Sequence, residues 1–111
     1  MPRDYKVYLD DILQAITRIR EYTAGLSPMA FAGDAKTFDA VVRNLEVIGE
    51  AARAVPETIR LEHPAVDWKK ISGLRDILIH QYFGVDAQII WDIIQNKLPP
   101  LEEQIRAMAK S

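Results

Sequence analysis

Apolar residues recur at steps of three and four positions along almost the whole chain, and this periodicity constrains the fold more than any other feature of the sequence. Four segments carry it, and all four have the period of an α-helix. The sequence contains no strand signal, no internal repeat and no low-complexity tract. The pattern therefore predicts an all-α fold built from four helices.

The first two predicted helices lie in the N-terminal half. One covers residues 5–22 and ends before the glycine and proline of residues 25–28. The next begins after Asp34, whose side chain suits a helix N-cap, and stops near Val55 because Pro56 cannot continue it. The predicted buried stripes are Tyr5, Tyr8, Leu9, Ile12, Ile16, Ile19 and Tyr22 in the first helix, and Phe38, Val41, Val42, Leu45, Ile48 and Ala52 in the second.

The other two predicted helices follow a linker with two prolines, residues 56–67, in which we expect a short turn of helix. Asp67 caps the third helix, over residues 68–81, and Asp86 caps the fourth. In the fourth helix Pro99-Pro100 predict a kink, after which the apolar face continues. The apolar face of the fourth helix is Ile89, Ile90, Ile93, Ile94, Leu98, Leu101, Ile105 and Met108.

Two glycines inside the helical pattern carry predictions of their own. Gly49 lies beside the apolar stripe of its helix, where the lack of a side chain would let a neighbouring helix approach closely. Gly73 weakens its helix by about 1 kcal/mol relative to alanine, so the helix can divide into two pieces there. With mostly short links, the four helices predict an up-down four-helix bundle forming one domain over residues 1–111.

Composition narrows the range of functions. The chain has no cysteine, which excludes a disulfide framework and a thiolate zinc site. Its two histidines match no zinc-binding pattern, so no metal or other cofactor is expected. A net charge of −2 offers no basic face, so a nucleic-acid function would depend on a local site. There is no signal-peptide core and no run of about 20 apolar residues, so a cytoplasmic protein is expected.

The stretch GLRDILIHQYFGVD, residues 73–86, places three polar groups, Arg75, His80 and Tyr82, in a segment that otherwise resembles core. On a regular helix Arg75 and His80 lie about 140° apart. They converge only if the helix ends near His80, if the long arginine side chain reaches around, or if a second copy of the chain supplies one of them. Gly84 favours the first alternative, and a histidine in a last helical turn is favoured in its protonated form. An imidazolium beside a guanidinium would bind phosphate.

Isolated residues of these types usually have simpler explanations. A lone arginine on a helix is most often a solvated charge, a lone histidine a structural group, and Tyr82 beside a C-cap glycine a packing residue. His63, which precedes a proline, is expected to be exposed to solvent. Glu46 and Glu50, one turn apart, are most simply a wet helix face. Lys69 and Lys70 either help to bind a ligand or are solvated, and Trp68 and Trp91 are expected in the core or in a dimer interface.

The pattern Arg, four residues, His, any residue, Tyr resembles the signature of the HEPN superfamily, specifically its HepT-like branch, and Arg75, His80 and Tyr82 match it position for position. The segments NLEVIGEAA, DWKKISGLRD and IIWDIIQNKLPPL also resemble that family, so the likeness covers nearly the whole chain. One position departs from the pattern. Asp76 stands where the family often has asparagine, and it adds a negative charge beside the expected phosphate site.

This resemblance implies a metal-independent endoribonuclease that is the toxin of a type VII-like toxin–antitoxin pair. Arg75 and His80 would be catalytic, and two protomers would join their motifs in a composite site across a homodimer interface. The implied antitoxin is an MntA-like nucleotidyltransferase that inactivates the toxin by transferring AMP to Tyr82. Asp76, Glu50, Lys69 and Lys70 are candidates for a supporting role.

Two other functions fit the same residues. The protein would be a catalytically silent helical dimer that binds the nucleotidyltransferase as a scaffold or modification substrate, or a small bundle that binds nucleotides at the Arg75–His80 anion site without cleaving RNA. The intact pair of Arg75 and His80 favours the ribonuclease, whereas Asp76 and the acidic balance of the chain leave room for a silent binder.

Overall fold

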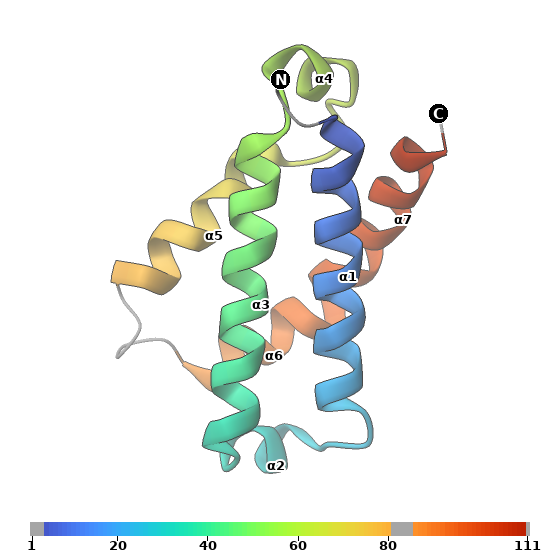
Figure 1. Cartoon of the computed structure of the whole chain (residues 1–111). Helices are drawn as coiled ribbons and strands as arrows, with labels where there is room; N and C mark the ends of the chain where they lie inside the picture. Colours follow the sequence, from blue (N-terminus) through green and yellow to red (C-terminus); the bar gives the residue numbers. More distant parts are fainter. Residues whose placement is uncertain (1–3, 81–85, 111) are drawn as a thin grey trace.

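The chain folds into a bundle of helices in a computed structural model that describes residues 4–80 and 86–110 (Figure 1). All the regular elements within these residues are helical. They are α1 (Tyr5–Thr23), α2 (Pro28–Ala32), α3 (Ala35–Ala54), α4 (Glu57–Glu62), α5 (Trp68–His80), α6 (Ala87–Asp92), the π-helical turn η2 (Ile93–Lys97) and α7 (Leu98–Ala109). In the described part of the chain, none of these helices is long and apolar enough to cross a membrane.

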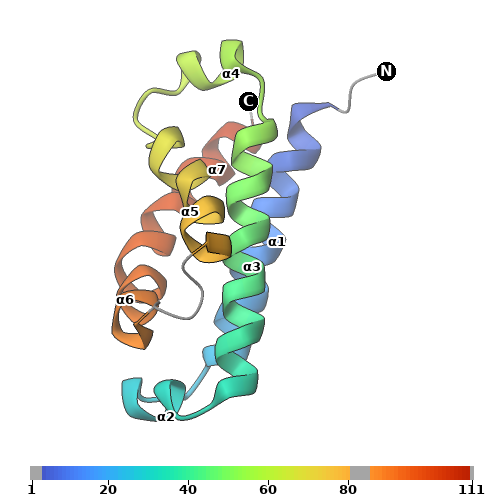
Figure 2. The ribbon, with the colours of Figure 1, turned by 90° about the vertical axis from the view of Figure 1, so that its left-hand side faces the viewer.

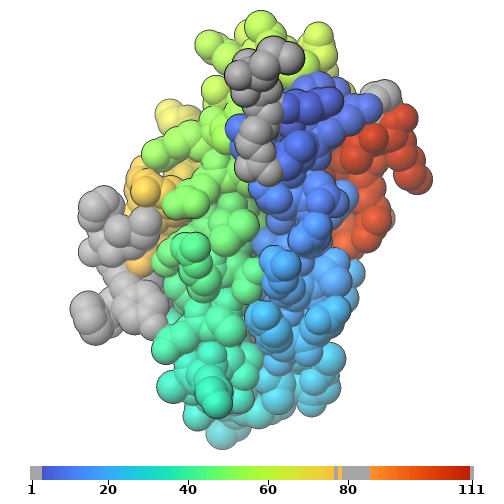
Figure 3. All heavy atoms as spheres, in the orientation of Figure 1, coloured from blue at the N-terminus to red at the C-terminus, as the bar shows by residue number. Residues whose placement is uncertain are grey.

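The long helices alternate in direction, as predicted. Helix α1 packs against α3 on one side and α7 on the other, while α5 packs on the outer side of α3 (Figures 1 and 2). The continuous series α6, η2 and α7 forms the fourth member of the bundle. In the space-filling view α1 and α3 make up most of one face, with α4 at one end of it and α2 at the other (Figure 3). The prediction of an all-α up-down four-helix bundle is confirmed.

The helix starts are set by aspartate side chains. Asp34 accepts a hydrogen bond from the Thr37 backbone amide (3.1 Å), which confirms the predicted N-cap of α3. Asp67 accepts from Lys70 N (3.1 Å) and Asp86 from Gln88 N (2.8 Å), so the starts of α5 and α6 are confirmed as well. Each carboxylate satisfies an amide that has no partner within its helix.

Two short helices lie outside the four long ones. The expected helical turn in the 56–67 linker is α4. Helix α2 was not predicted; it begins at Pro28, and Ser27 caps it by accepting from the Ala30 amide at 3.1 Å. A serine followed by proline at the first helical position is a recognised start signal, so the sequence did contain the information needed to find α2.

The core forms where the apolar stripes meet, with two exceptions to the predicted pattern. Tyr22 is 42% exposed and Ile89 is 60% exposed, although both were expected to be buried. Successive helical residues point about 100° apart, so a neighbour takes the inward position, namely Thr23 in α1 and Ile90 in α6. The fully buried large side chains are Phe31, Leu9, Ile12, Ile16, Ile19, Leu45, Ile48, Leu78, Ile90, Ile105, Val41 and Val42.

The predicted irregularities are placed differently from expectation. Helix α5 runs through Gly73 without a break, so the suggested division there is wrong. The disturbance from Pro99-Pro100 appears one turn earlier, in η2, where the Leu98 amide donates to the Ile93 carbonyl five residues back. The prolines offer no N–H groups to the preceding turn and their rings crowd its carbonyls, so that turn widens before α7 restarts with prolines in its first turn.

Candidate active site around Arg75

The backbone of Arg75 is held against α3 at Gly49. A Cβ atom added to Gly49 would lie 3.0 Å from the Arg75 amide nitrogen, 3.1 Å from its Cβ and 3.2 Å from the Ile71 carbonyl oxygen. Only a residue without a side chain permits this contact, because two of the three facing atoms belong to the backbone of α5. The predicted close approach of a helix at Gly49 is confirmed, and the approaching helix is the one that carries Arg75.

The side chain of Arg75 lies between two carboxylates. Its Nε donates to Glu50 Oε1 at 3.0 Å, and its Nη1 is 3.5 Å from Asp76 Oδ1. Asp76 also accepts from Arg53 Nη2 at 2.9 Å through its other oxygen. The four side chains thus form an alternating series of Glu50, Arg75, Asp76 and Arg53 across the α3–α5 contact, here called the α3–α5 ion network.

This network is accessible to a ligand. The side chain of Arg75 is 35% exposed, and the other three side chains of the network are each about half exposed. Ion pairs this exposed contribute little to folding stability, typically about 0–1 kcal/mol each. Their effect is on orientation, because contacts at Nε and Nη1 fix the plane of the Arg75 guanidinium.

The other two motif residues can be placed only in part. His80 is the last residue of α5, about 7.5 Å along the helix axis from Arg75. The side chain of His80, and the whole of Tyr82 and Gly84, lie outside the described residues. The convergence of the three motif side chains, and the stop at Gly84, therefore stay predictions.

Comparison with known sequences identifies the family. The sequence profile of the ribonuclease HepT-like family matches residues 12–108, nearly the entire chain. The chain belongs to the ribonuclease HepT-like family. Among curated HepT-like relatives, the "Probable ribonuclease HepT" of Thermococcus cleftensis is 39% identical over 110 residues, covering 99% of this chain and 100% of the relative.

Further relatives have similar coverage. A "Putative RNase" of Methanocaldococcus jannaschii is 43% identical over 99% of this chain and 92% of its own length. A "Putative RNase" of Caldanaerobacter subterraneus subsp. tengcongensis is 44% identical over 89% of this chain and 88% of its own length. No solved structure matches the chain. The resemblance noted in the motif thus extends to whole HepT-like sequences.

The supporting candidates of this HepT-like protein separate into two groups. Glu50 and Asp76 contact Arg75 directly. Lys69 and Lys70, in the first turn of α5, are exposed and have no recorded contact with Arg75 among the described residues. Glu46 lies 3.5 Å from Arg43 and its side chain is 18% exposed, so the wet-face interpretation fits Glu50, which is half exposed, better than Glu46.

The remaining candidates serve the fold. His63 is only partly exposed, so the expectation of a solvent-exposed residue is wrong: its carbonyl accepts a hydrogen bond from Trp68 Nε1 (3.0 Å), which ties the 63–67 loop to the core. Trp68 is 7% exposed, and Trp91 packs on Phe31 with ring centroids 5.3 Å apart. Both tryptophans contribute to packing within the chain, one of the two places expected for them.

Arg53 is the functional candidate that sequence reasoning missed. It lies one turn after Glu50 on α3, on the side that faces α5. The three-residue spacing of Glu50 and Arg53 indicates that they share a helix face. Only the packing of α5 shows that this face contacts Arg75 and Asp76. Across residues 4–80 and 86–110, no group of three acidic, histidine or cysteine side chains is arranged to hold a metal ion.

Proposed function

We propose that this HepT-like protein is a metal-independent endoribonuclease that acts as the toxin of a type VII-like toxin–antitoxin pair. The observation that carries the proposal is the presentation of Arg75, held on α3 by Gly49 and oriented by Glu50, on the helix that also carries His80. Membership of the family, and relatives named as ribonucleases over almost their full length, support the same activity.

The reaction uses a nucleophile that RNA itself supplies. The 2′-hydroxyl oxygen attacks the adjacent phosphorus, forming a P–O2′ bond while the P–O5′ bond breaks. His80 takes the proton from the 2′-hydroxyl or gives one to the 5′-oxygen, a contribution worth about 10²- to 10⁴-fold. Arg75 holds the phosphate and stabilises the charge that builds up on its oxygens. No metal takes part in these steps.

A homodimer would complete this site. Acid and base catalysis usually require two groups, whereas each chain brings one motif histidine. A two-fold axis beside α5 would bring a second His80 to the same phosphate, with each protomer contributing equally. The composite site is thus a proposal from chemical need and family resemblance.

Regulation would act on Tyr82, two residues after His80. Transfer of AMP to its hydroxyl by an MntA-like nucleotidyltransferase would place a bulky anion next to the site meant for the substrate phosphate. Sterics and like charge would then exclude RNA. The antitoxin would inactivate the enzyme without unfolding it.

One observation favours a second function. Two carboxylates already contact the Arg75 guanidinium, so an incoming phosphate has to compete with Glu50 and Asp76. A silent dimer that only binds the nucleotidyltransferase would have no need to release Arg75 from these partners.

Growth inhibition separates the two functions. Expression of the wild-type chain without its antitoxin should arrest growth, and His80→Ala at equal protein level should not. Equal toxicity of the two chains would contradict the ribonuclease, and so would the absence of toxicity from the wild type when its mass shows no added AMP.

A further inference from the structure

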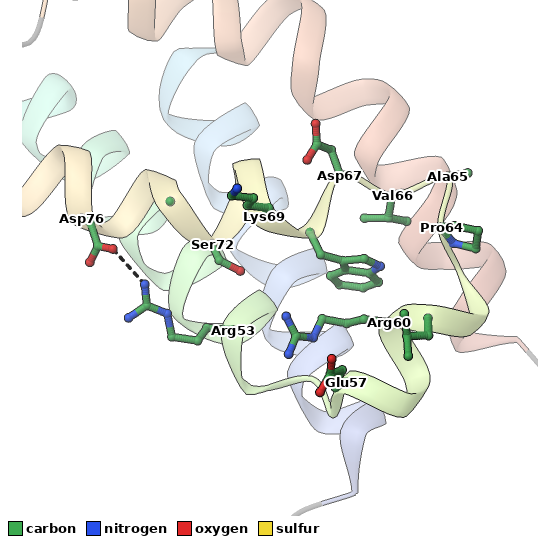
Figure 4. A pocket seen from close by; sticks show the side chains of 13 residues that line it. Arg53, Glu57, Arg60, Pro64, Ala65, Val66, Asp67, Lys69, Ser72 and Asp76 are labelled. Atoms are coloured by element: carbon green, nitrogen blue, oxygen red, sulfur yellow. Dashed lines mark hydrogen bonds and ion pairs between the residues drawn. The ribbon is translucent and has the colours of Figure 1, made fainter.

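A pocket of about 880 Å³ opens between α4 and the N-terminal half of α5 (Figure 4). We call it the α4–α5 pocket, and its size falls in the range of small-ligand sites. It adjoins the candidate active site, because Arg53 and Asp76, 2.9 Å apart, belong both to its lining and to the α3–α5 ion network.

Two buried polar atoms in the lining of this pocket have no hydrogen-bond partner within the described residues. They are Arg60 Nε and Ser72 Oγ. Leaving such a group unsatisfied costs about 1–3 kcal/mol, so each requires an explanation. In Figure 4 the Arg60 guanidinium and the Ser72 hydroxyl both point into the pocket. Both atoms are donors, and one is cationic, so an anion rich in acceptor oxygens would satisfy them once small rotations of the two side chains bring the buried atoms to the pocket surface.

The carboxylates of the pocket do not cancel this preference. Asp76 already accepts from Arg53, and Asp67 is occupied as the N-cap of α5. Lys69, exposed in the first turn of α5, adds a further cation to the lining. With Glu57 as the third carboxylate, the lining has as many acidic as basic side chains, so the attraction for an anion is local to Arg60.

The rest of the lining suits a base and a sugar. Glu57 offers acceptor oxygens to an amino group or a ribose hydroxyl, and Leu61, 72% exposed, supplies apolar surface, whereas Trp68 and Val66 expose only 7% and 4%. A ligand with one phosphate, hydroxyl groups and a flat base matches this combination. That ligand is a nucleotide.

The α4–α5 pocket lies a few nucleotide lengths from the proposed cleavage site. Ser72 and His80 are eight residues apart on α5, which corresponds to about 12 Å along the helix axis. At a stacked rise of about 3.4 Å per nucleotide, this distance is about three to four nucleotides. We propose that the α4–α5 pocket is an RNA subsite that holds a nucleotide about three to four positions from the cleaved bond. This inference rests on the proposed function, because the RNA is the substrate of that same site.

The test compares short and long RNA. Oligonucleotides with 2′-O-methyl groups lack the nucleophile and stay intact, so their affinity is measured by fluorescence anisotropy at fixed salt. A strand extending about five nucleotides beyond the cleaved bond should bind the wild type about tenfold more tightly than one extending a single nucleotide. Arg60→Gln should remove this gain and leave the short strand unaffected.

Two further variants keep the test decisive. Lys36→Gln removes the same charge from an exposed position at the opposite end of α3, so it should retain the length-dependent gain. Ser72→Ala removes an unsatisfied hydroxyl, so it should lower affinity for the long strand while leaving the unfolding midpoint unchanged or raised. A structural role for Ser72 would shift the midpoint downward instead.

The outcomes separate this inference from the ribonuclease proposal. If Arg60→Gln and Ser72→Ala bind the long strand like the wild type, the subsite is refuted even if unmodified RNA is cleaved. If the length effect depends on Arg60 but no RNA is cleaved, the ribonuclease proposal fails and the position of the subsite relative to a cleaved bond fails with it, while RNA binding in the α4–α5 pocket is retained. Free AMP should bind much more weakly than the long strand; equal affinity would overturn the RNA subsite in favour of a site for free nucleotides.

Discussion

Arg75 is fixed by side chains on both of the helices that meet at its position. Glu50 reaches it from α3 and Asp76 from its own helix, while Arg53 balances Asp76. Because these pairs are exposed, they act on the orientation of the guanidinium more than on stability. An asparagine in place of Asp76 would lack the negative charge that here pairs with Arg53.

We therefore propose that Glu50 is a positioning residue for Arg75. Glu50→Gln should lower the kcat of RNA cleavage about tenfold by loosening the Arg75 guanidinium, with a change of less than about 0.5 kcal/mol in the free energy of unfolding. Glu46→Gln, one turn earlier on α3, is the matched control and should keep wild-type kcat. Single-turnover cleavage and urea unfolding measure both effects, and a Glu50→Gln enzyme as fast as the wild type would contradict the assignment.

At the scale of elements, the contact of α3 with α5 decides where the site lies. It depends on Gly49, whose missing side chain lets the backbone of α5 lie against α3. The neighbouring glycine on α5 has no such function, because a Cβ at Gly73 would meet nothing within 4 Å. Alanine substitutions at Gly49 and Gly73 are therefore expected to change the stability of the protein in opposite directions.

Gly49→Ala should destabilise the protein by about 1–2 kcal/mol, because the cost of overpacking exceeds the gain in helix propensity. It should also reduce RNA cleavage, since α5 moves away with Arg75. Gly73→Ala, placed in open space inside α5, should stabilise by about 0.5–1 kcal/mol. Urea unfolding of both variants checks the pair, and a Gly49→Ala protein as stable as Gly73→Ala would show that the close approach is not needed.

At the scale of the whole molecule, ion pairs connect the first helix, α1, with the last helix, α7. Arg20 on α1 makes two contacts with Glu102 on α7, at 2.8 and 3.2 Å, and Arg106 adds a third at 3.2 Å. The hydrogen bond from Arg20 is the main cause that lowers the pKa of Glu102, with Arg106 adding to it against the opposing effect of burial. The same contact raises the pKa of Arg20.

This pKa shift makes stability depend on pH. A carboxyl group with a lower pKa in the folded state stabilises the fold above its unfolded pKa, about 4.3, and loses that contribution as the pH falls through its folded pKa. Glu102→Gln should therefore cost about 0.5–1 kcal/mol at pH 7, and the difference from wild type should shrink below about pH 4. Glu103→Gln, exposed beside it, should show little effect. Thermal unfolding from pH 7 to pH 3 tests this; a constant difference would contradict it.

Much of this architecture follows from local patterns in the sequence. Helical periodicity and the aspartate caps predicted the four long helices, because both depend on residues within a few positions of each other. The α3–α5 ion network was not predictable in the same way. Glu50 and Arg75 are 25 residues apart, and their meeting depends on the register in which α5 lies on α3. Likewise, the α4–α5 pocket brings Arg60 and Ser72 together only through the fold of the linker.

RNA cleavage by the purified chain in EDTA tests the central claim most directly. Wild type, Arg75→Ala and His80→Ala are compared on one single-stranded RNA, after mass spectrometry has shown that Tyr82 carries no AMP. The account predicts cleavage by the wild type that EDTA does not reduce, and a loss of at least about 10²-fold in each variant. Cleavage that requires a metal ion, or that persists in either variant, would contradict it.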